Sequence, residues 1–186
     1  WSVLFDSDEF IWYSEKTNWG HLYLYDLKTK ALKNEITSGN FIVKQLKSID
    51  KEKRQLYFSA GGKEVGNPYH NYYYKVNFDG TNFTNLTPSK GTHSVTISDD
   101  YSLLVDTYST TTEPPITVLR NGFGEKIMDL ETADISELKE KNWQAPIEFS
   151  VKSRDEKIDL YGIMCLPSHY NANKKYPVLN YIYPGP

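Results

Sequence analysis

Short stretches in which apolar residues alternate with polar or aromatic ones cover most of the first 130 positions of the chain. For example, His21, Tyr23 and Tyr25 alternate with Leu22 and Leu24. A period of two is typical of β-strands, because successive side chains point to opposite faces of a sheet. Such stretches, separated by turn residues, predict strands at 9–14, 21–26, 31–37, 41–49, 54–59, 71–76, 82–87, 94–98, 101–109, 115–119 and 125–130.

The predicted strands recur in groups of similar length. Three of them end in serine, at Ser14, Ser59 and Ser109, with spacings of 45 and 50 residues, and Thr37 and Thr87 are also 50 residues apart. Periods of this length, with about four strands each, are typical of the blades of a β-propeller.

We therefore predict a mainly β chain in which residues 1–130 form a partial β-propeller of about three four-stranded blades. Each blade buries its faces against its neighbours. Because propellers usually have four to eight blades, we expect further blades to precede this segment. A β-sandwich with strands of similar length is the alternative.

Residues 131–146 have a different pattern. The sequence Asp134-Ile135-Ser136-Glu137 has the form of a capping box, and the next four residues continue as a helix. Pro146 ends it, because the residue before a proline avoids the α conformation. We predict a helix that connects two domains.

The last stretch, residues 147–186, begins a second domain in this interpretation. A hairpin is predicted over 147–167, followed by a polar loop over 168–175. The apolar run 176–183 then predicts a buried strand, which needs covering layers on both faces. The 186 residues contain no such layers, so we expect the chain to be a piece of a longer protein.

Composition supports β structure and excludes several functions. Aromatic residues make up 15% of the chain, with fifteen tyrosines, and these residues favour strands. The net charge of −3 without a basic block argues against nucleic acid or an anionic membrane as partner. The single cysteine, Cys165, lies in an apolar run, where we expect a buried, inert thiol rather than a nucleophile.

Motifs for metal or cofactor binding are weak, and we predict neither. The acidic runs Asp6-Ser7-Asp8-Glu9 and Asp99-Asp100 lack the spacing and glycine of a calcium loop. The glycine-rich segment 60–70 joins two strands rather than opening a helix, which argues against phosphate binding. We expect this loop to be a blade extension at a rim or a subunit contact.

The histidines carry no predicted catalytic role. We expect His21, His93 and His169 to cap strands or face solvent, and His70 to lie in a flexible loop. Two triplets, Asn82-Phe83-Thr84 and Asn85-Leu86-Thr87, fit the acceptor pattern for N-glycosylation.

Several motifs follow one another in a fixed order: Trp12-Tyr13-Ser14-Glu15, Gly20 to Tyr25, Leu86-Thr87-Pro88, Asp106-Thr107-Tyr108-Ser109, Pro114-Pro115, Leu166-Pro167, Lys175-Tyr176-Pro177 and Tyr183-Pro184-Gly185-Pro186. This ordered set resembles the dipeptidyl peptidase IV family of prolyl-oligopeptidase-type serine peptidases. The resemblance implies the last blades of an eight-bladed propeller over 1–130, a connector helix over 131–146, and the truncated start of an α/β-hydrolase domain over 147–186.

The resemblance also assigns one candidate catalytic residue. Tyr183 matches the tyrosine whose hydroxyl helps to form the oxyanion hole, where it stabilises the tetrahedral intermediate. The alternative is that Tyr183 is simply an aromatic residue at a strand end. Pro184 departs from the glycine or alanine commoner at its position and stiffens the turn. No Gly-x-Ser-x-Gly occurs, so we expect the Ser-Asp-His triad and the paired glutamates that hold the substrate amino terminus outside the 186 residues.

The family implies a parent enzyme that releases N-terminal dipeptides, usually after proline. In that parent the propeller would gate and position the peptide substrate, and the fragment alone would be inactive. Expected partners are the peptide, the rest of the peptidase chain, a second subunit in a homodimer, and other copies of the fragment through uncovered blade faces. The location implied is periplasmic, secreted or membrane-anchored. A propeller-type binding module without catalysis, or a relative that has lost its serine, remains an alternative.

Overall fold

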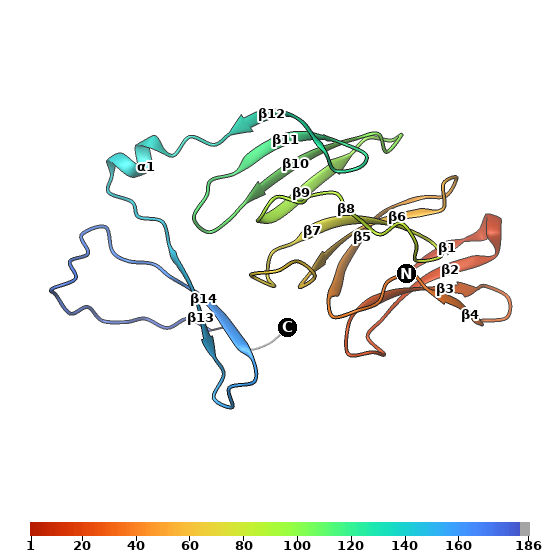
Figure 1. Ribbon diagram of the computed structural model, residues 1–186, viewed down its shortest axis with the longest axis horizontal. Coiled ribbons are helices and arrows are strands. Elements are labelled where there is room, and N and C mark those ends of the chain that lie inside the picture. Colours follow the sequence, from red (N-terminus) through yellow and green to blue (C-terminus); the bar gives the residue numbers. More distant parts are fainter. Residues whose placement is uncertain (183–186) are drawn as a thin grey trace. The chain divides into compact units, whose positions relative to one another are not determined.

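The computed structural model describes residues 1–182 and confirms a mainly β chain that forms a partial propeller. Three four-stranded antiparallel sheets are followed by a short helix and a two-stranded hairpin (Figure 1). The chain divides into two compact units, one over residues 1–133 and one that begins at Asp134. Each unit is described by itself.

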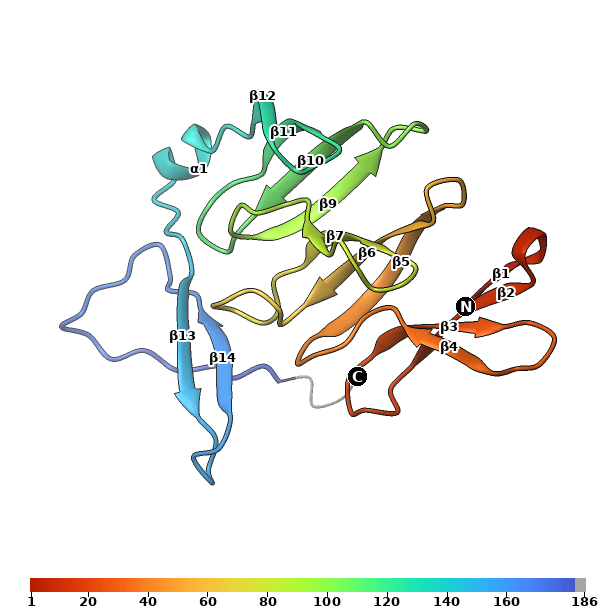
Figure 2. The same cartoon turned by 45° about the vertical axis from the view of Figure 1, so that its right-hand side comes forward.

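The three sheets of the first unit are the predicted blades, and they stand side by side (Figure 2). Blade 1 contains β1 (Ser2–Leu4), β2 (Glu9–Ser14), β3 (His21–Asp26) and β4 (Leu32–Glu35), with a 3-10 turn, η1 (Phe5–Ser7), between the first two strands. Blade 2 contains β5 (Ile42–Asp50), β6 (Gln55–Gly61), β7 (Tyr72–Asn77) and β8 (Thr84–Asn85). Blade 3 contains β9 (Thr92–Ile97), β10 (Leu103–Ser109), β11 (Ile116–Asn121) and β12 (Lys126–Thr132).

Two strands of the first unit differ clearly from the prediction. The three-residue strand β1 was missed, because so short a stretch has no periodicity of its own; it is held by pairing with β2. The predicted strand over 82–87 shrinks to the two residues of β8. Asn82 has a positive φ of 54°, and the Asn85 side chain accepts a hydrogen bond from the Thr87 N–H at 2.9 Å. Neither end of the predicted strand therefore continues the β-pairing with β7.

Alternate residues of blade 2 face opposite neighbours, which explains its aromatic content. Leu56 and Phe58 belong to the core shared with blade 1, where they join Ile11. Tyr57, between them in sequence, belongs to the core shared with blade 3, where it joins Leu104. Strand periodicity therefore gives blade 2 two buried faces.

A side-chain hydrogen bond marks the repeat in the structure. The Thr37 hydroxyl accepts the Leu22 N–H at 2.9 Å, and the Thr87 hydroxyl accepts the Tyr73 N–H at 2.9 Å. The threonines therefore occupy equivalent places in blades 1 and 2, as their spacing of 50 predicted.

The equivalence of Ser14 and Ser59, inferred from their spacing of 45 residues, was wrong by one position. Leu22 pairs with Tyr13, and its counterpart Tyr73 pairs with Ser59. Ser59 is therefore equivalent to Tyr13 rather than to Ser14. Because side chains alternate, this shift exchanges the two faces of the strand.

The second unit contains α1 (Ser136–Glu140), β13 (Ile147–Lys152) and β14 (Asp159–Met164). The predicted capping box is not formed: Ile135 is the N-cap and makes no side-chain cap, while the Asp134 carboxylate accepts hydrogen bonds from the Ser136 N–H and hydroxyl. The helix is only five residues long because it has no buried face to extend it. Within residues 1–182 no helix is long and apolar enough to cross a membrane.

The end of the described chain departs furthest from the prediction. Residues 175–182 form no strand, and Val178 and Leu179 are 88% and 96% exposed. A strand requires a hydrogen-bonding neighbour, and none of the residues 1–182 pairs with this segment. Cys165 is exposed rather than buried, as is most of the strand that precedes it, β14.

Candidate functional site

Tyr183, the candidate oxyanion-hole residue, lies outside the described residues, together with Pro184. Its role stays a prediction. The candidate sites that the structure describes all lie in the first unit.

The prediction that His21, His93 and His169 cap strands or face solvent was wrong for His21 and His93, which are buried, and His70, predicted in a loop, lies in the loop before β7 but is buried as well. His21, His70 and His93 are only 2%, 6% and 3% exposed, while His169 is exposed. His21 is accommodated in the core because both ring nitrogens have partners: Nε2 lies 2.9 Å from the Gly39 carbonyl oxygen, and Nδ1 lies 3.1 Å from the Thr37 hydroxyl. Buried polar partners of this kind leave no sequence signal.

A buried charged network holds blade 3 together. Asp106 accepts hydrogen bonds from Arg120 Nε at 2.8 Å and lies 2.8 Å from His93 Nδ1. The other ring nitrogen of His93 faces the Ser89 carbonyl oxygen at 2.7 Å, and the Ser89 hydroxyl accepts from Arg120. A catalytic dyad needs a hydroxyl at that nitrogen. The network therefore joins β9, β10 and β11 structurally and is no nucleophile site.

A second charged cluster joins blades 1 and 2. Glu9 is 2% exposed and binds Arg54 through two bonds, Nη1–Oε2 at 2.9 Å and Nη2–Oε1 at 3.2 Å, with Lys33 as a further partner. Burial raises the pKa of Glu9, but the hydrogen bonds from Arg54 and Lys33 outweigh it and lower the pKa to about 2. Glu9 is therefore ionised at neutral pH and ties the two blades together.

The acidic run that contains Glu9 is engaged by basic side chains. Asp6 pairs with Lys51 at 3.4 Å, and Asp8 pairs with Lys28 at 2.5 Å. Among residues 1–182, no three His, Cys, Asp or Glu side chains lie where they could share a metal ion.

The glycine-rich loop of blade 2 is anchored by Glu64. Its carboxylate accepts hydrogen bonds from the Tyr74 hydroxyl at 2.9 Å and from Asn85 Nδ2 at 3.1 Å. The side-chain nitrogen of the second glycosylation triplet is thereby occupied, whereas Asn82 of the first triplet is exposed. The loop projects Val65 fully into solvent.

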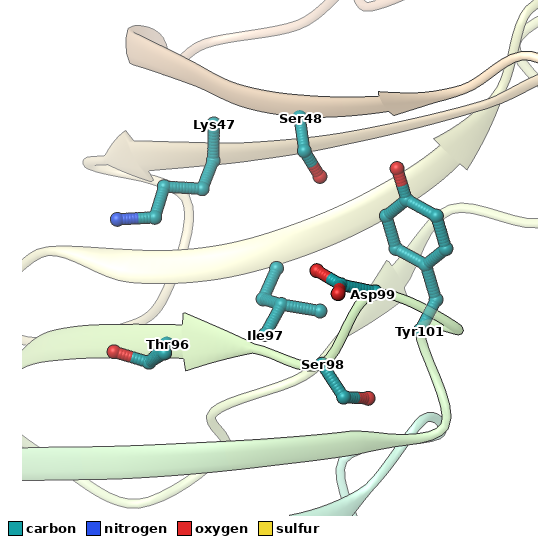
Figure 3. A pocket seen from close by; sticks show the side chains of 7 residues that line it. All are labelled: Lys47, Ser48, Thr96, Ile97, Ser98, Asp99 and Tyr101. Atoms are coloured by element: carbon teal, nitrogen blue, oxygen red, sulfur yellow. The ribbon is translucent and has the colours of Figure 1, made fainter.

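A polar cavity of about 300 Å³ lies between blades 2 and 3 (Figure 3). Its lining comes from β5 and from the end of β9 with the following turn: Lys47, Ser48, Thr96, Ile97, Ser98, Asp99 and Tyr101. Figure 3 shows the Ser48 side chain directed from β5 toward the turn that carries Asp99 and Tyr101. We call this cavity the seam pocket.

Several polar groups of the seam pocket lack partners among the described residues. The Ser48 hydroxyl is buried without a hydrogen bond. Lys47 and Asp99 take part in no hydrogen bond or ion pair within residues 1–182, although both line the pocket. Tyr101 forms one wall: its ring stacks on Tyr57 at 4.7 Å between centroids. No local pattern predicts this site, because its residues come from two blades and lie some fifty positions apart in the chain.

A second cavity, of about 290 Å³, adjoins the Glu9 cluster. Its cations are already engaged: Lys33 and Arg54 bind Glu9, and Lys53 pairs with Asp50 at 3.4 Å. The seam pocket is therefore the stronger candidate for a ligand site.

Comparison with known proteins finds similarity to dipeptidyl peptidases. Residues 2–115 match the model of the dipeptidyl peptidase IV (DPP IV) N-terminal region. The chain is 29% identical over 158 residues to Probable dipeptidyl-aminopeptidase B of Paracoccidioides brasiliensis, an alignment that covers 81% of this chain and 17% of the relative. It is 28% identical over 156 residues to the protein of the same name from Aspergillus fumigatus, with the same coverage.

Solved structures share the fold. Dipeptidyl peptidase 4 of Porphyromonas gingivalis superposes with a TM-score of 0.71 at 24% identity, covering 91% of this chain and 24% of that one. A Bacteroides ovatus structure gives a TM-score of 0.73 at 21% identity, covering 91% and 26%. The chain thus spans about a sixth of the length of the curated relatives and about a quarter of the solved chains.

Proposed function

Since the chain belongs to the dipeptidyl peptidase IV N-terminal region family, we propose that it forms part of a serine exopeptidase that releases N-terminal dipeptides of the Xaa-Pro type from peptides. The observation that carries the proposal is the family match over residues 2–115. The names of the relatives and the three-bladed fold support it.

The blades have the role of gating and positioning the peptide. The Glu9–Arg54 pair joins blades 1 and 2, and the Asp106–Arg120 pair joins two strands of blade 3, which suits a scaffold that screens substrates. The chemistry is Ser-His-Asp acyl transfer, in which a hydroxyl attacks the carbonyl and donors stabilise the oxyanion. Because the chain has no Gly-x-Ser-x-Gly, the nucleophile comes from another part of the protein.

The proposed division of the chain follows the same reasoning. Residues 1–130 are the propeller part, 131–146 the connector and 147–186 the start of the hydrolase domain, where Tyr183 supplies one oxyanion donor. The exposed apolar residues of the hairpin, such as Phe149, Val151 and Leu160, fit a sheet that is completed by further strands.

The proposed partners are the peptide, the remaining peptidase chain and a second subunit. In the 186-residue chain, exposed apolar side chains remain on the outward faces of the terminal blades: Trp12 in blade 1, and Leu103 and Val105 in blade 3. These faces support self-association of the chain when it is produced alone. The proposed location is periplasmic, secreted or membrane-anchored.

The test uses the full-length gene product and a synthetic peptide with proline as its second residue. We expect mass spectrometry to detect the N-terminal dipeptide as the first product. The same peptide with an acetylated amino terminus is the control, and it should stay intact, since an exopeptidase requires the free amino group. Binding of the peptide without cleavage by the folded protein would replace this proposal with the binding-module function.

A further inference from the structure

The seam pocket combines features that the proposed function does not use. One is the Ser48 hydroxyl, which is buried and has no hydrogen-bond partner among residues 1–182. A buried polar group left unpaired is destabilising, so native proteins rarely retain one without a water or ligand. The hydroxyl therefore points to an occupant of the pocket.

The second feature is a pair of opposite charges that do not meet. Lys47 belongs to blade 2 and Asp99 to blade 3, and both line the pocket, yet no ion pair within 4.0 Å joins them to each other or to another described residue. Neighbouring charges behave differently: Lys53 pairs with Asp50, and Asp100 accepts hydrogen bonds from Ser102 at 2.7 and 2.8 Å. The pocket thus presents one free cation and one free anion, judged over residues 1–182.

The third feature is the wall formed by Tyr101. This residue has a positive φ of 60°, which is uncommon for a bulky residue and persists only where the surroundings hold it. Its N–H bonds to the Ser98 carbonyl at 2.9 Å, and its ring stacks on Tyr57. The strained turn therefore fixes an aromatic ring and its hydroxyl at the mouth of the pocket.

We propose that the seam pocket binds a small zwitterion, a free amino acid or a dipeptide, whose carboxylate meets Lys47 and whose ammonium group meets Asp99. The volume of about 300 Å³ is at the lower limit of small-molecule sites, so it selects small ligands. A simple anion is disfavoured by Asp99, and a simple cation by Lys47. This inference goes beyond the proposed function and does not rest on it.

Calorimetric titration of the 186-residue chain with alanyl-proline tests the proposal. Two blocked probes each remove one charge: N-acetyl-alanyl-proline lacks the ammonium group, and alanyl-prolinamide lacks the carboxylate. We expect saturable binding of the free dipeptide, and affinity at least about tenfold lower for each blocked form.

Two variants assign each charge to its residue. Lys47→Gln should lower the affinity for the free dipeptide about tenfold and leave the affinity for the amide unchanged. Asp99→Asn should also lower the affinity for the free dipeptide about tenfold, and leave the affinity for the acetylated probe unchanged. Both side chains are exposed, so the fold should tolerate the changes, and Lys90→Gln is a matched control on another exposed lysine, which lies between β8 and β9 and does not line the pocket. Any of four results would overturn the proposal. The three probes could bind equally, both variants could keep their affinity, or binding could fail to saturate at about 10 mM dipeptide. A crystal grown with dipeptide that holds only water in the pocket is the fourth.

Discussion

The guanidinium group of Arg54, in blade 2, donates two hydrogen bonds to the carboxylate of Glu9, in blade 1, at 2.9 and 3.2 Å. Glu9 is almost fully buried, whereas the Arg54 side chain is 46% exposed. The pair is reinforced from both sides: Lys33 shares the carboxylate, and the guanidinium lies 4.6 Å from the centre of the Phe78 ring. These charged side chains therefore join blades 1 and 2 across a largely hydrophobic interface, and we call the Glu9–Arg54 pair the clamp.

Removal of this clamp should destabilise the first unit. Arg54→Ala leaves a buried carboxylate with Lys33 alone, and we expect a loss of about 2 kcal/mol in the free energy of unfolding. The matched control is Lys51→Ala, which removes the exposed pair with Asp6 between the same two blades and should change stability by less than about 0.5 kcal/mol. Urea unfolding followed by circular dichroism measures the free energy of unfolding of both variants. Equal losses of stability would show that the Glu9–Arg54 pair contributes no more than an exposed ion pair.

The same carboxylate predicts a pH dependence. The pKa of Glu9 is lowered from 4.5 to about 2 in the folded chain, so the folded state binds fewer protons than the unfolded state between these values. The stabilisation is complete above the unfolded pKa and is lost as the pH falls toward 2. We expect Glu9→Gln to be less stable than the parent chain at neutral pH and to lose less stability between pH 5 and pH 2. Parallel acid transitions in the two proteins would show that Glu9 does not contribute.

The network in blade 3 should be more sensitive still. Asp106 is fully buried, and Asp106→Ala leaves Arg120 and His93 without their acceptor, so we expect a loss of about 3–5 kcal/mol. Asp129→Ala, which removes an exposed ion pair with Lys126, is the control and should be nearly neutral. Thermal unfolding of both variants gives the comparison, and a small effect of Asp106→Ala would mean that the network is replaceable by solvent.

The turn that follows β11 packs directly on blade 2. Gly124 has a φ of +88°, and an added Cβ would lie 2.7 Å from Leu86 Cα and 2.8 Å from its carbonyl oxygen. Gly124→Ala should therefore cost about 3 kcal/mol, through backbone strain and the clash together. Gly66→Ala has a similar φ of +112° but open space around it, and should cost about 1 kcal/mol. Equal losses of unfolding free energy in the two variants would show that the positive φ alone, and not the contact with Leu86, determines the cost.

The sequence predicted the strands and blades well because strand periodicity and turn residues are local signals. It failed where partners come from distant positions. His93 is buried because Asp106 supplies an acceptor from the neighbouring strand β10, beside the nearby Ser89 carbonyl, and no pattern around the histidine reveals this pairing. The one-residue shift between Ser14 and Ser59 has a similar origin, since register is fixed by pairing rather than by the residue type at a strand end.

The functional residues were harder to find than the fold. The seam pocket depends on Lys47 and Asp99 approaching from separate blades, and neither lies in a motif. The helix itself was predicted, but its capping box was not formed, because the Asp134 carboxylate accepts hydrogen bonds from Ser136 and so uses the local capping pattern in a different geometry.

Tyr183 offers a test of the catalytic assignment in the full-length protein. Tyr183→Phe removes one oxyanion donor and should lower kcat about 10²–10³-fold with little change in KM, because the bond forms mainly in the transition state. Tyr181→Phe, which removes a tyrosine hydroxyl two residues earlier to which no oxyanion role is assigned, is the control and should keep its activity. A normal kcat for Tyr183→Phe would assign this tyrosine to a strand end without catalytic function.

The most direct test of the account compares the full-length protein and the 186-residue chain on a chromogenic Xaa-Pro anilide. We predict that the full-length protein releases the chromophore and that the 186-residue chain, although folded, does not. Hydrolysis by the isolated chain, or none by the folded full-length protein, would contradict the conclusion that these blades serve a dipeptidyl peptidase.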